Sequence, residues 1–245
     1  MNSFFRLLGG RIARYISEPL PRYEVFSNVT LPLLKQSLLP GDLLLVEGNS
    51  RVSTAIKYLT QSTWSHVCLF IGEREGLNPL LEADLVGGVV TVPLDKYEGF
   101  NLRICRPISL AEGDLQQVLE YAIDRIGLHY DTKNIIDLMR YLFPMPPVPA
   151  RFRRKMIAFG SGDPTKAICS TLVAQAFQSI KYPILPREID VCEIDDPALC
   201  EQVYLEKKHF THFTPRDFDL SPYFQIIKPT IEASFDYKII KWQEQ

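Results

Sequence analysis

A succession of short apolar runs between residues 64 and 107 is the feature that most limits how this chain can fold. The first run, WSHVCLFIG (64–72), is rich in β-branched and aromatic residues and ends at a glycine, as a strand does. Strands cluster in this region and helices flank it, without the regular β-α-β alternation of a parallel sheet. This order predicts one α+β domain with a mostly antiparallel sheet. The other runs are NPLLEADLVGG (78–88), GVVTVPL (88–94) and FNLRICRP (100–107).

Apolar residues at helical spacing mark the flanking helices. In the segment that follows residue 49, Val52, Ile56 and Leu59 share one face of a helix. A later helix carries a similar apolar stripe and stops at Gly127, because glycine readily takes the backbone conformation that ends a helix. The predicted helices cover residues 50–62, 109–127 and about 169–180, and further strands are predicted within 39–49 and 213–229.

Size and charge limit the class of protein. A chain of 245 residues that is 46% hydrophobic can bury a substantial core, as one large domain or two small ones. The formal net charge is −2, whereas a general nucleic-acid binder needs a broad excess of basic residues. We therefore expect no nucleic-acid partner.

The cysteines argue against a disulfide framework. Their number is five, which is odd, and no C-x-x-C pair occurs. Cys68 and Cys105 lie within apolar runs, so a reducing, cytoplasmic compartment is predicted. His66 and Cys68 alternate along one strand, but no second pair of metal ligands accompanies them. No metal or other cofactor is predicted.

Residues 1–38 are predicted to form an N-terminal extension before a main domain at 39–245. Arginines interrupt its apolar residues, so it is a poor secretory signal, and the chain contains no apolar window of about 20 residues that would span a membrane. Wound as a helix, the extension presents a broad apolar face edged by arginines, which suits a membrane interface. The alternative is a helix docked on the protein's own core, and we favour it because Gly9 and Gly10 interrupt the helix.

A proline-rich stretch at 143–164 is predicted to be an inserted loop. It contains four basic residues among the five from Arg151 to Lys155. Such a run is usually solvated surface, and an anionic head group or substrate is the alternative partner. Together with the N-terminal extension, it predicts weak, salt-sensitive contact with anionic membranes.

Cys169 opens the apolar run STLVAQAF at the predicted start of a helix. Unpaired N–H groups at a helix N-terminus favour a thiolate and can stabilise an oxyanion in acyl transfer. Asp163 and Pro164 would cap an earlier start, which would move Cys169 to the second turn. The structural alternative is that Cys169 belongs to the core, since it shares one helical face with Leu172 and Val173.

His66 and Glu82 are the candidate partners of this cysteine. His66 lies in a strand, where an imidazole needs a hydrogen-bond partner and is more often structural than catalytic. A Cys–His site usually needs a third group that orients the imidazole. Glu82 and Asp84 share one face of a strand, and an acid among leucines is costly to bury unpaired. The alternative is an edge strand with its acidic face in water.

The motifs and their order resemble the permuted papain-like cysteine hydrolases, which include rearranged NlpC-type amidases, YiiX-like proteins and lecithin:retinol acyltransferase relatives. The resemblance covers roughly residues 39–180. It is carried by PGDLLLVEGNSRVSTAIKYLTQSTWSHVCLFIG, by GLHYD (127–131) and by ICSTLVAQAF, with TPRDF (214–218) as a tail. The resemblance implies a permuted papain-like fold with the nucleophile at a helix N-terminus. It also implies that Cys169 is the nucleophile, His66 the base and Glu82 the third member, with His66 preceding Cys169 as permutation requires.

This resemblance implies a cysteine-dependent hydrolase or acyltransferase that acts on an amide or ester, with a peptide-like or lipid acyl substrate, through a covalent acyl-enzyme. One alternative is a catalytically inactive papain-like scaffold that binds a lipid or protein partner. A redox-sensing thiol protein would need a resolving cysteine, for which only Cys192 and Cys200 lie downstream. The sequence leaves the substrate, the acyl acceptor and the oligomeric state open.

Overall fold

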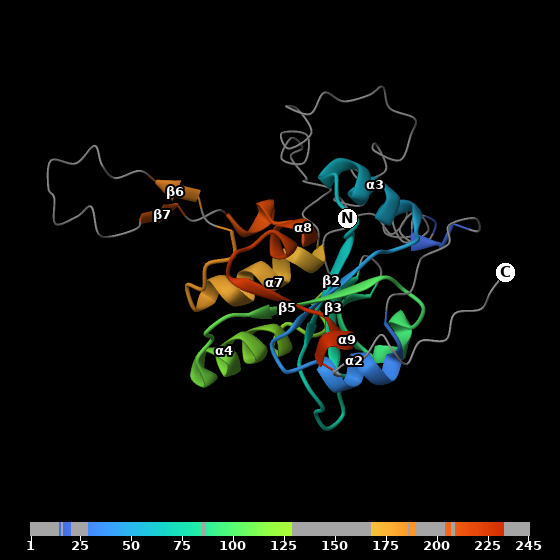
Figure 1. Cartoon of the computed structure of the whole chain (residues 1–245), viewed down its shortest axis with the longest axis horizontal. Helices are drawn as coiled ribbons and strands as arrows, with labels where there is room; N and C mark the ends of the chain where they lie inside the picture. The colour runs from blue at the N-terminus through green and yellow to red at the C-terminus, as the bar shows by residue number, and fades with distance from the viewer. Residues whose placement is uncertain are drawn as a thin grey trace, which may run out of the picture.

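The structure is a computed structural model, and it describes residues 15, 17–20, 29–84, 87–128, 168–185, 187–189, 204–206 and 209–232. Its centre is a six-stranded sheet with the strand order β4-β3-β2-β1-β5-β8, in which every neighbouring pair is antiparallel (Figure 1). The α+β class and the antiparallel sheet are confirmed. The permuted papain-like arrangement itself stays a prediction.

The elements follow the expected order along the chain. The central strands are β1 (Leu43–Val46), β2 (His66–Phe70), β3 (Leu80–Asp84), β4 (Gly88–Val92), β5 (Leu102–Pro107) and β8 (Phe224–Ile227), and a separate hairpin joins β6 (Arg187–Ile189) to β7 (Tyr204–Glu206). The helices are α2 (Leu31–Ser37), α3 (Arg51–Thr60), α4 (Glu112–Ile123), α7 (Ile168–Ser179), α8 (Pro215–Asp219) and α9 (Pro229–Glu232), with short 3₁₀ turns η1 (Leu94–Tyr97) and η2 (Phe210–His212).

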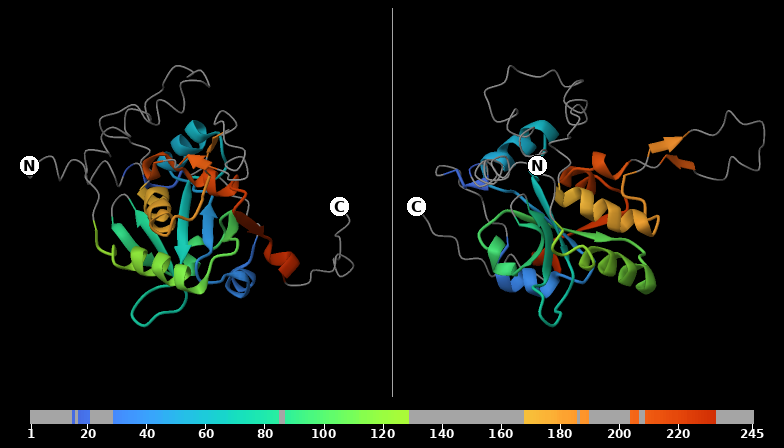
Figure 2. Two further views of the ribbon diagram at one scale, coloured as in Figure 1. Left: turned by 90° about the vertical axis from the view of Figure 1, so that its left-hand side faces the viewer. Right: turned by 180° about the vertical axis from the view of Figure 1, so that it is seen from behind.

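Each face of the sheet buries its own apolar cluster. Alternation along β2 sends Val67 and Leu69 into the cluster under α4 and α7, whereas Cys68 and Phe70 join the cluster under α2 and η1. Two views at right angles show α4 and α7 on one side of the sheet and α2 on the other (Figure 2). The sheet is therefore the middle layer, and a polar group that points to either face is buried unless it lies near a strand end.

A glycine and a buried carboxylate set the start of β1. Gly41 has φ +92°, and a Cβ atom there would lie 2.5 Å from Leu115 Cδ1, so a larger residue would collide with α4. Asp42, only 1% exposed, receives hydrogen bonds from Leu39 N at 2.8 Å and from Arg106 Nε and Nη2 at 2.8 and 2.7 Å. The Gly-Asp pair of the sequence thus fixes where β1 begins and joins it to β5.

The C-terminal part of the described chain contains a helix that the sequence patterns do not predict. The stretch at 213–229 was expected as a turn and a strand, and it contains a short helix, α8, in addition to β8. The helix forms because Thr214 and Asp217 make a reciprocal capping box, which local apolar patterning does not reveal. The loop at 143–164 and all but a few residues of the extension at 1–38 lie outside the described residues.

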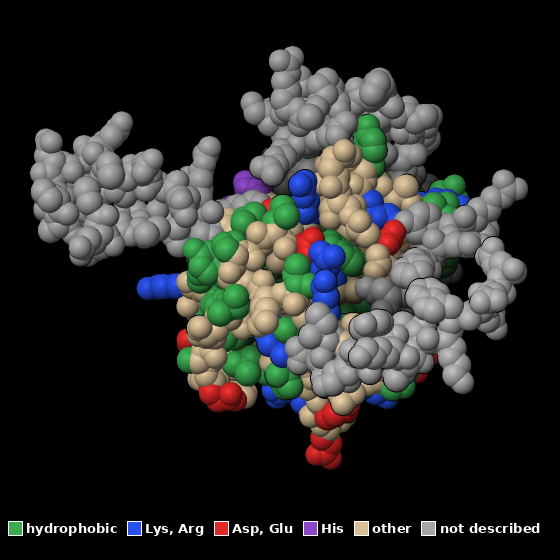
Figure 3. Space-filling model, viewed as in Figure 1, with side chains coloured by type: hydrophobic (Ala, Val, Ile, Leu, Met, Phe, Trp, Pro, Cys, Tyr) green, Lys and Arg blue, Asp and Glu red, His purple; other side chains and the backbone are tan. Residues whose placement is uncertain are grey.

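Within the described part of the chain, no helix combines the length and the apolar character needed to cross a membrane. On the face seen in Figure 3, acidic and basic side chains of the described residues are interspersed among hydrophobic ones, in keeping with the small net charge.

Candidate functional site

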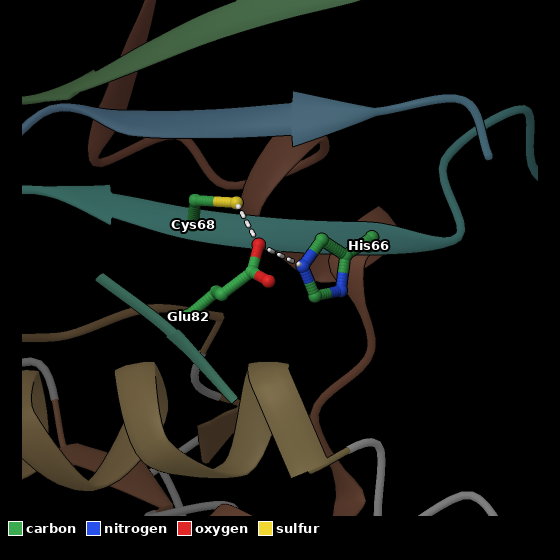
Figure 4. Close-up of side chains that lie close together, drawn as sticks. All are labelled: His66, Cys68 and Glu82. Atoms are coloured by element: carbon green, nitrogen blue, oxygen red, sulfur yellow. Dashed lines mark hydrogen bonds and ion pairs between the residues drawn. The ribbon is translucent and has the colours of Figure 1, made fainter. Parts of the chain in front are cut away.

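His66 and Glu82 form the centre of a buried polar cluster between β2 and β3. The antiparallel register pairs Leu69 with Leu81, and its continuation places Glu82 opposite Cys68, on the same face as His66. His66 Nε2 lies 3.2 Å from Glu82 Oε2 (Figure 4), and the Glu82 side chain is 1% exposed. Glu82 is therefore buried and paired. The alternative of an acidic face in water is wrong for Glu82, and β3 is an interior strand of the sheet.

Two side chains that the sequence analysis did not single out complete the surroundings of Glu82. The turn η1 brings the Lys96 ammonium to Glu82 Oε1 and the Tyr97 hydroxyl to Glu82 Oε2, each as a hydrogen-bond donor. The Tyr97 ring also packs edge-on against Phe100, with centroids 5.7 Å apart. The local sequence signal for this turn is LDKY, in which Leu94 and Tyr97 are buried at 3₁₀ spacing. This pattern does not reveal that the Lys96 and Tyr97 polar groups contact Glu82.

The cluster keeps Glu82 ionised. Burial by itself would raise the pKa of this carboxyl, but the hydrogen bond and charge of His66, followed by those of Lys96, hold the pKa well below its usual range. A charged acceptor at this position holds the imidazole through a charge-assisted hydrogen bond.

The His66 side chain reaches solvent, with 22% of its surface exposed. Burial would lower the pKa of His66, but its electrostatic interactions and hydrogen bonds with Cys68 and Cys169 raise that pKa well above its ordinary value. The hydrogen bond to Glu82 acts in the same direction, since a carboxylate favours the imidazolium. One imidazole thus interacts with an acid and with two thiols.

Cys169 lies in the first described turn of α7 and is 5% exposed. The hydroxyl of its neighbour Ser170 donates a 2.7 Å hydrogen bond to the Phe213 carbonyl, which attaches this turn to the segment before α8. Cys169 packs in the same cluster as Leu172 and Val173, as the structural alternative expected, and it also acts electrostatically on His66. The alternative helix start at Asp163 and Pro164 lies outside the described residues.

Cys68, which follows His66 on the same strand face but is not among the site residues predicted from the sequence, is part of the cluster. Its thiol is completely buried and donates to Glu82 Oε2 at 3.5 Å. Burial raises the pKa of Cys68, His66 opposes that shift, and the charge of Glu82 reinforces it. The raised pKa keeps Cys68 a protonated thiol at neutral pH, which argues against it as a nucleophile.

The other sequence candidates lie apart from this cluster or outside the described residues. Asp84, on the same strand as Glu82, accepts a 2.6 Å hydrogen bond from Gly87 N and serves the turn between β3 and β4. Cys105 is free and buried. Cys192 and Cys200 fall in a segment that the structure does not describe.

Comparison with known proteins adds structural likeness without a match in sequence. No known family profile matches the chain, and no curated protein matches it. Among solved structures, the crystal structure of metalloprotein yiiX from Escherichia coli O157:H7 is similar, with 18% identity over 78% of this chain and 97% of that chain and a TM-score of 0.48. A TM-score at this level does not establish a common fold.

Proposed function

We propose that this protein is a cysteine-dependent hydrolase or acyltransferase that acts on an amide or ester through a covalent acyl-enzyme. The observation that carries the proposal is the hydrogen bond from His66 to a buried, ionised Glu82, on an imidazole that also interacts with Cys169 of α7. A nucleophile, a base and a group that orients the base are the three parts that such chemistry requires.

Each residue has a distinct role in this proposal. Glu82 engages His66 Nε2, which leaves Nδ1 as the ring nitrogen available to the Cys169 thiol. Transfer of the thiol proton to Nδ1 produces a thiolate and an imidazolium, and Glu82 stabilises the imidazolium. Lys96 and Tyr97 are positioning residues, because they bond to Glu82 and not to the reacting groups.

The reaction then proceeds in two steps, acylation and deacylation. The Cys169 sulfur attacks the substrate carbonyl, and backbone N–H groups in the first turn of α7 are suited to stabilise the oxyanion. His66 gives its proton to the departing amine or alcohol as the carbon–nitrogen or carbon–oxygen bond breaks, leaving an acyl-enzyme. Water or another acceptor next loses a proton to His66 and attacks the acyl group, which frees the Cys169 thiol.

Peptide-like and lipid acyl substrates both fit this chemistry. The apolar and basic N-terminal extension and the Arg151–Lys155 run favour an anionic lipid surface. A cytoplasmic location with peripheral membrane contact is part of this proposal.

Selective alkylation tests the nucleophile directly. With iodoacetamide near pH 6 and a chelator present, an unperturbed thiol, with a pKa of about 8.5, reacts at about a hundredth or less of its full thiolate rate. We expect mass spectrometry of the native chain to find Cys169 modified ahead of the other cysteines. His66→Ala should abolish this preference, and Glu82→Gln should slow Cys169 by roughly tenfold or more, the effect of one pKa unit.

Cys105→Ser is the matched control, because Cys105 lies in β5 away from the cluster and its loss should leave the rate at Cys169 unchanged. An inert Cys169 beside another, faster cysteine would refute the hydrolase proposal. The burial of Cys169 against Leu172 and Val173 would then favour the inactive scaffold.

A further inference from the structure

Three different donor atoms converge beside the proposed catalytic base. The ligand-capable atoms of His66, Cys68 and Glu82 all lie within 4.8 Å of one another. Figure 4 shows the Cys68 sulfur and the His66 ring nitrogen on either side of one Glu82 oxygen. The proposed catalytic mechanism uses His66 and Glu82 and assigns no role to Cys68.

The hydrogen bonds around Glu82 Oε2 are crowded. This oxygen is approached by His66 Nε2, Cys68 Sγ and the Tyr97 hydroxyl, and a carboxylate oxygen has about two lone pairs to offer. A cation bound to Oε2, Nε2 and Sγ would replace two of these three donors, and Tyr97 alone would remain as a donor to Oε2. The crowding is thus relieved if the imidazole and the thiol become ligands instead of donors.

The donor set and its spacing select the kind of cation. Nitrogen, sulfur and carboxylate ligands together suit zinc and its neighbours, not magnesium or calcium. The usual bond lengths around a tetrahedral zinc place nitrogen and oxygen ligands about 3.3 Å apart and sulfur and oxygen ligands about 3.6 Å apart. The corresponding distances here are 3.2 Å from His66 Nε2 to Glu82 Oε2 and 3.5 Å from Cys68 Sγ to the same oxygen.

We propose that His66, Cys68 and Glu82 bind one divalent cation of the zinc class. Binding forms bonds to Nε2, Sγ and Oε2 and releases the thiol proton of Cys68 and the Nε2 proton of His66 to solvent. The charges of the thiolate and the carboxylate then balance the two charges of the cation. Lys96 stays on Glu82 Oε1, the oxygen that the cation does not need.

The surroundings of the cluster agree with this assignment. Cys68 and Glu82 are almost fully buried, whereas the His66 side chain is 22% exposed, so the cation enters past the imidazole. The ligands come from two paired strands inside the sheet, which holds all three ligand atoms within 4.8 Å of one another without the cation. A preformed set of donors avoids the cost of ordering ligands on binding.

The cation also has a consequence for the thiol chemistry, and this part rests on the proposed function. A cation between His66 Nε2 and Glu82 Oε2 replaces the hydrogen bond through which Glu82 orients the imidazole toward Cys169. The site is therefore a switch in which the cation-bound chain is inactive and the cation-free chain is active.

Cobalt(II) binding tests the site without any activity measurement. The metal-stripped full chain, titrated with Co²⁺, should bind one ion and develop the near-ultraviolet thiolate-to-cobalt absorption band. Cys68→Ser should lose the band, whereas Cys105→Ser and Cys169→Ser should keep it. Absence of the band in the wild-type chain, or its survival in Cys68→Ser, would overturn the proposal. Loss of the band in Cys169→Ser but not in Cys68→Ser would also overturn it.

A second variant guards against a folding defect in Cys68→Ser. His66→Ala removes a partly exposed ligand and leaves Cys68 in place, and we expect its affinity for Co²⁺, measured by equilibrium dialysis, to fall at least tenfold with an unchanged circular dichroism spectrum. Unaltered affinity would overturn the assignment of His66.

The two proposals fail in different measurements. Zinc at a concentration that saturates the cobalt site should suppress the preferential alkylation of Cys169 in the wild-type chain. A normal cobalt band with an inert Cys169 would refute the hydrolase and leave the metal site standing. A reactive Cys169 without a cobalt band would refute the metal site and leave the hydrolase standing. A reactive Cys169 in the zinc-saturated chain would refute the switch.

Discussion

Two carboxylates are buried to the same extent in this protein and lie in different surroundings. Asp42 is 1% exposed at the start of β1, and Glu82 is 2% exposed within β3. Both Asp42 oxygens accept from the fork of one guanidinium, Arg106, and from a backbone amide. Glu82 instead accepts from an imidazole, an ammonium, a phenol and a thiol.

The two pKa values move in opposite directions. Burial raises the pKa of Asp42, and the hydrogen bond and charge of Arg106 offset this rise only in part. At Glu82, His66 and Lys96 outweigh burial and lower the pKa of the carboxyl. Burial alone therefore does not identify a functional acid. The hydrogen-bond partners determine the direction of the pKa shift. Glu82 differs from Asp42 because its partner His66 can itself lose a proton and reaches solvent, whereas Arg106 stays charged.

The largest effect is expected from Asp42→Ala. It would leave the Arg106 guanidinium without its buried partner and Leu39 N without an acceptor, which typically costs about 3–5 kcal/mol of unfolding free energy. Urea unfolding followed by circular dichroism measures this loss. The preferential alkylation of Cys169 should survive in conditions where the variant is folded. Loss of this preference in the folded variant would show that Asp42 also supports the candidate site.

Tyr97→Phe should have an intermediate effect. It removes one hydrogen bond to a buried carboxylate, worth about 1.5–3 kcal/mol, and retains the ring against Phe100. Tyr182→Phe is the matched control, because the Tyr182 hydroxyl donates to backbone carbonyls away from the cluster. Both variants should lower the urea midpoint, and only Tyr97→Phe should also slow alkylation of Cys169. Equal alkylation rates in the two variants would show that Tyr97 does not position the site.

Opposite pKa shifts predict opposite contributions to acid stability in chelator-treated protein. The lowered pKa of Glu82 stabilises the fold above its ordinary value of 4.5, and this contribution is lost as the pH falls through the native pKa. The raised pKa of Asp42 stabilises the fold below its ordinary value of 3.8, and this contribution is lost as the pH rises through the native pKa.

Between pH 5 and 3, the free energy of unfolding should therefore fall less in Glu82→Gln than in the wild-type chain. The reduction is about 1.4 kcal/mol for each unit by which the pKa of Glu82 differs between the folded and unfolded states. Asp42→Asn should not reduce the fall. Urea unfolding at a series of pH values gives both slopes, and a flatter slope in Asp42→Asn would reverse the comparison.

The smallest effect is expected from Lys96→Gln. The Lys96 side chain is 40% exposed, and ion pairs with an exposed partner contribute about 0–1 kcal/mol. The change in the urea midpoint should be small and should shrink further in added salt. A loss as large as that of Tyr97→Phe would mean that Lys96, not Tyr97, is the main support of Glu82.

Local patterns in the sequence determined the secondary structure well. The alternation in WSHVCLFIG and NPLLEADLVGG predicted β2 and β3, and it put His66 with Cys68 and Glu82 with Asp84 on shared strand faces. Period two and period 3.6 are properties of neighbouring residues, so they can be read without knowing the fold. The same patterns did not reveal the helix α8, because it depends on a capping box within five residues.

The sequence by itself determined the α+β class, the central strands and helices, and the choice of His66, Cys169 and Glu82 as candidates. Only the tertiary structure decided that Glu82 is buried, that Lys96 and Tyr97 close over it, that Cys68 belongs to the same cluster, and that Asp42 pairs with Arg106. The physical reason is distance along the chain. A buried charge is stable only with partners, and those partners come from elements that meet through strand register and packing, which no local pattern encodes.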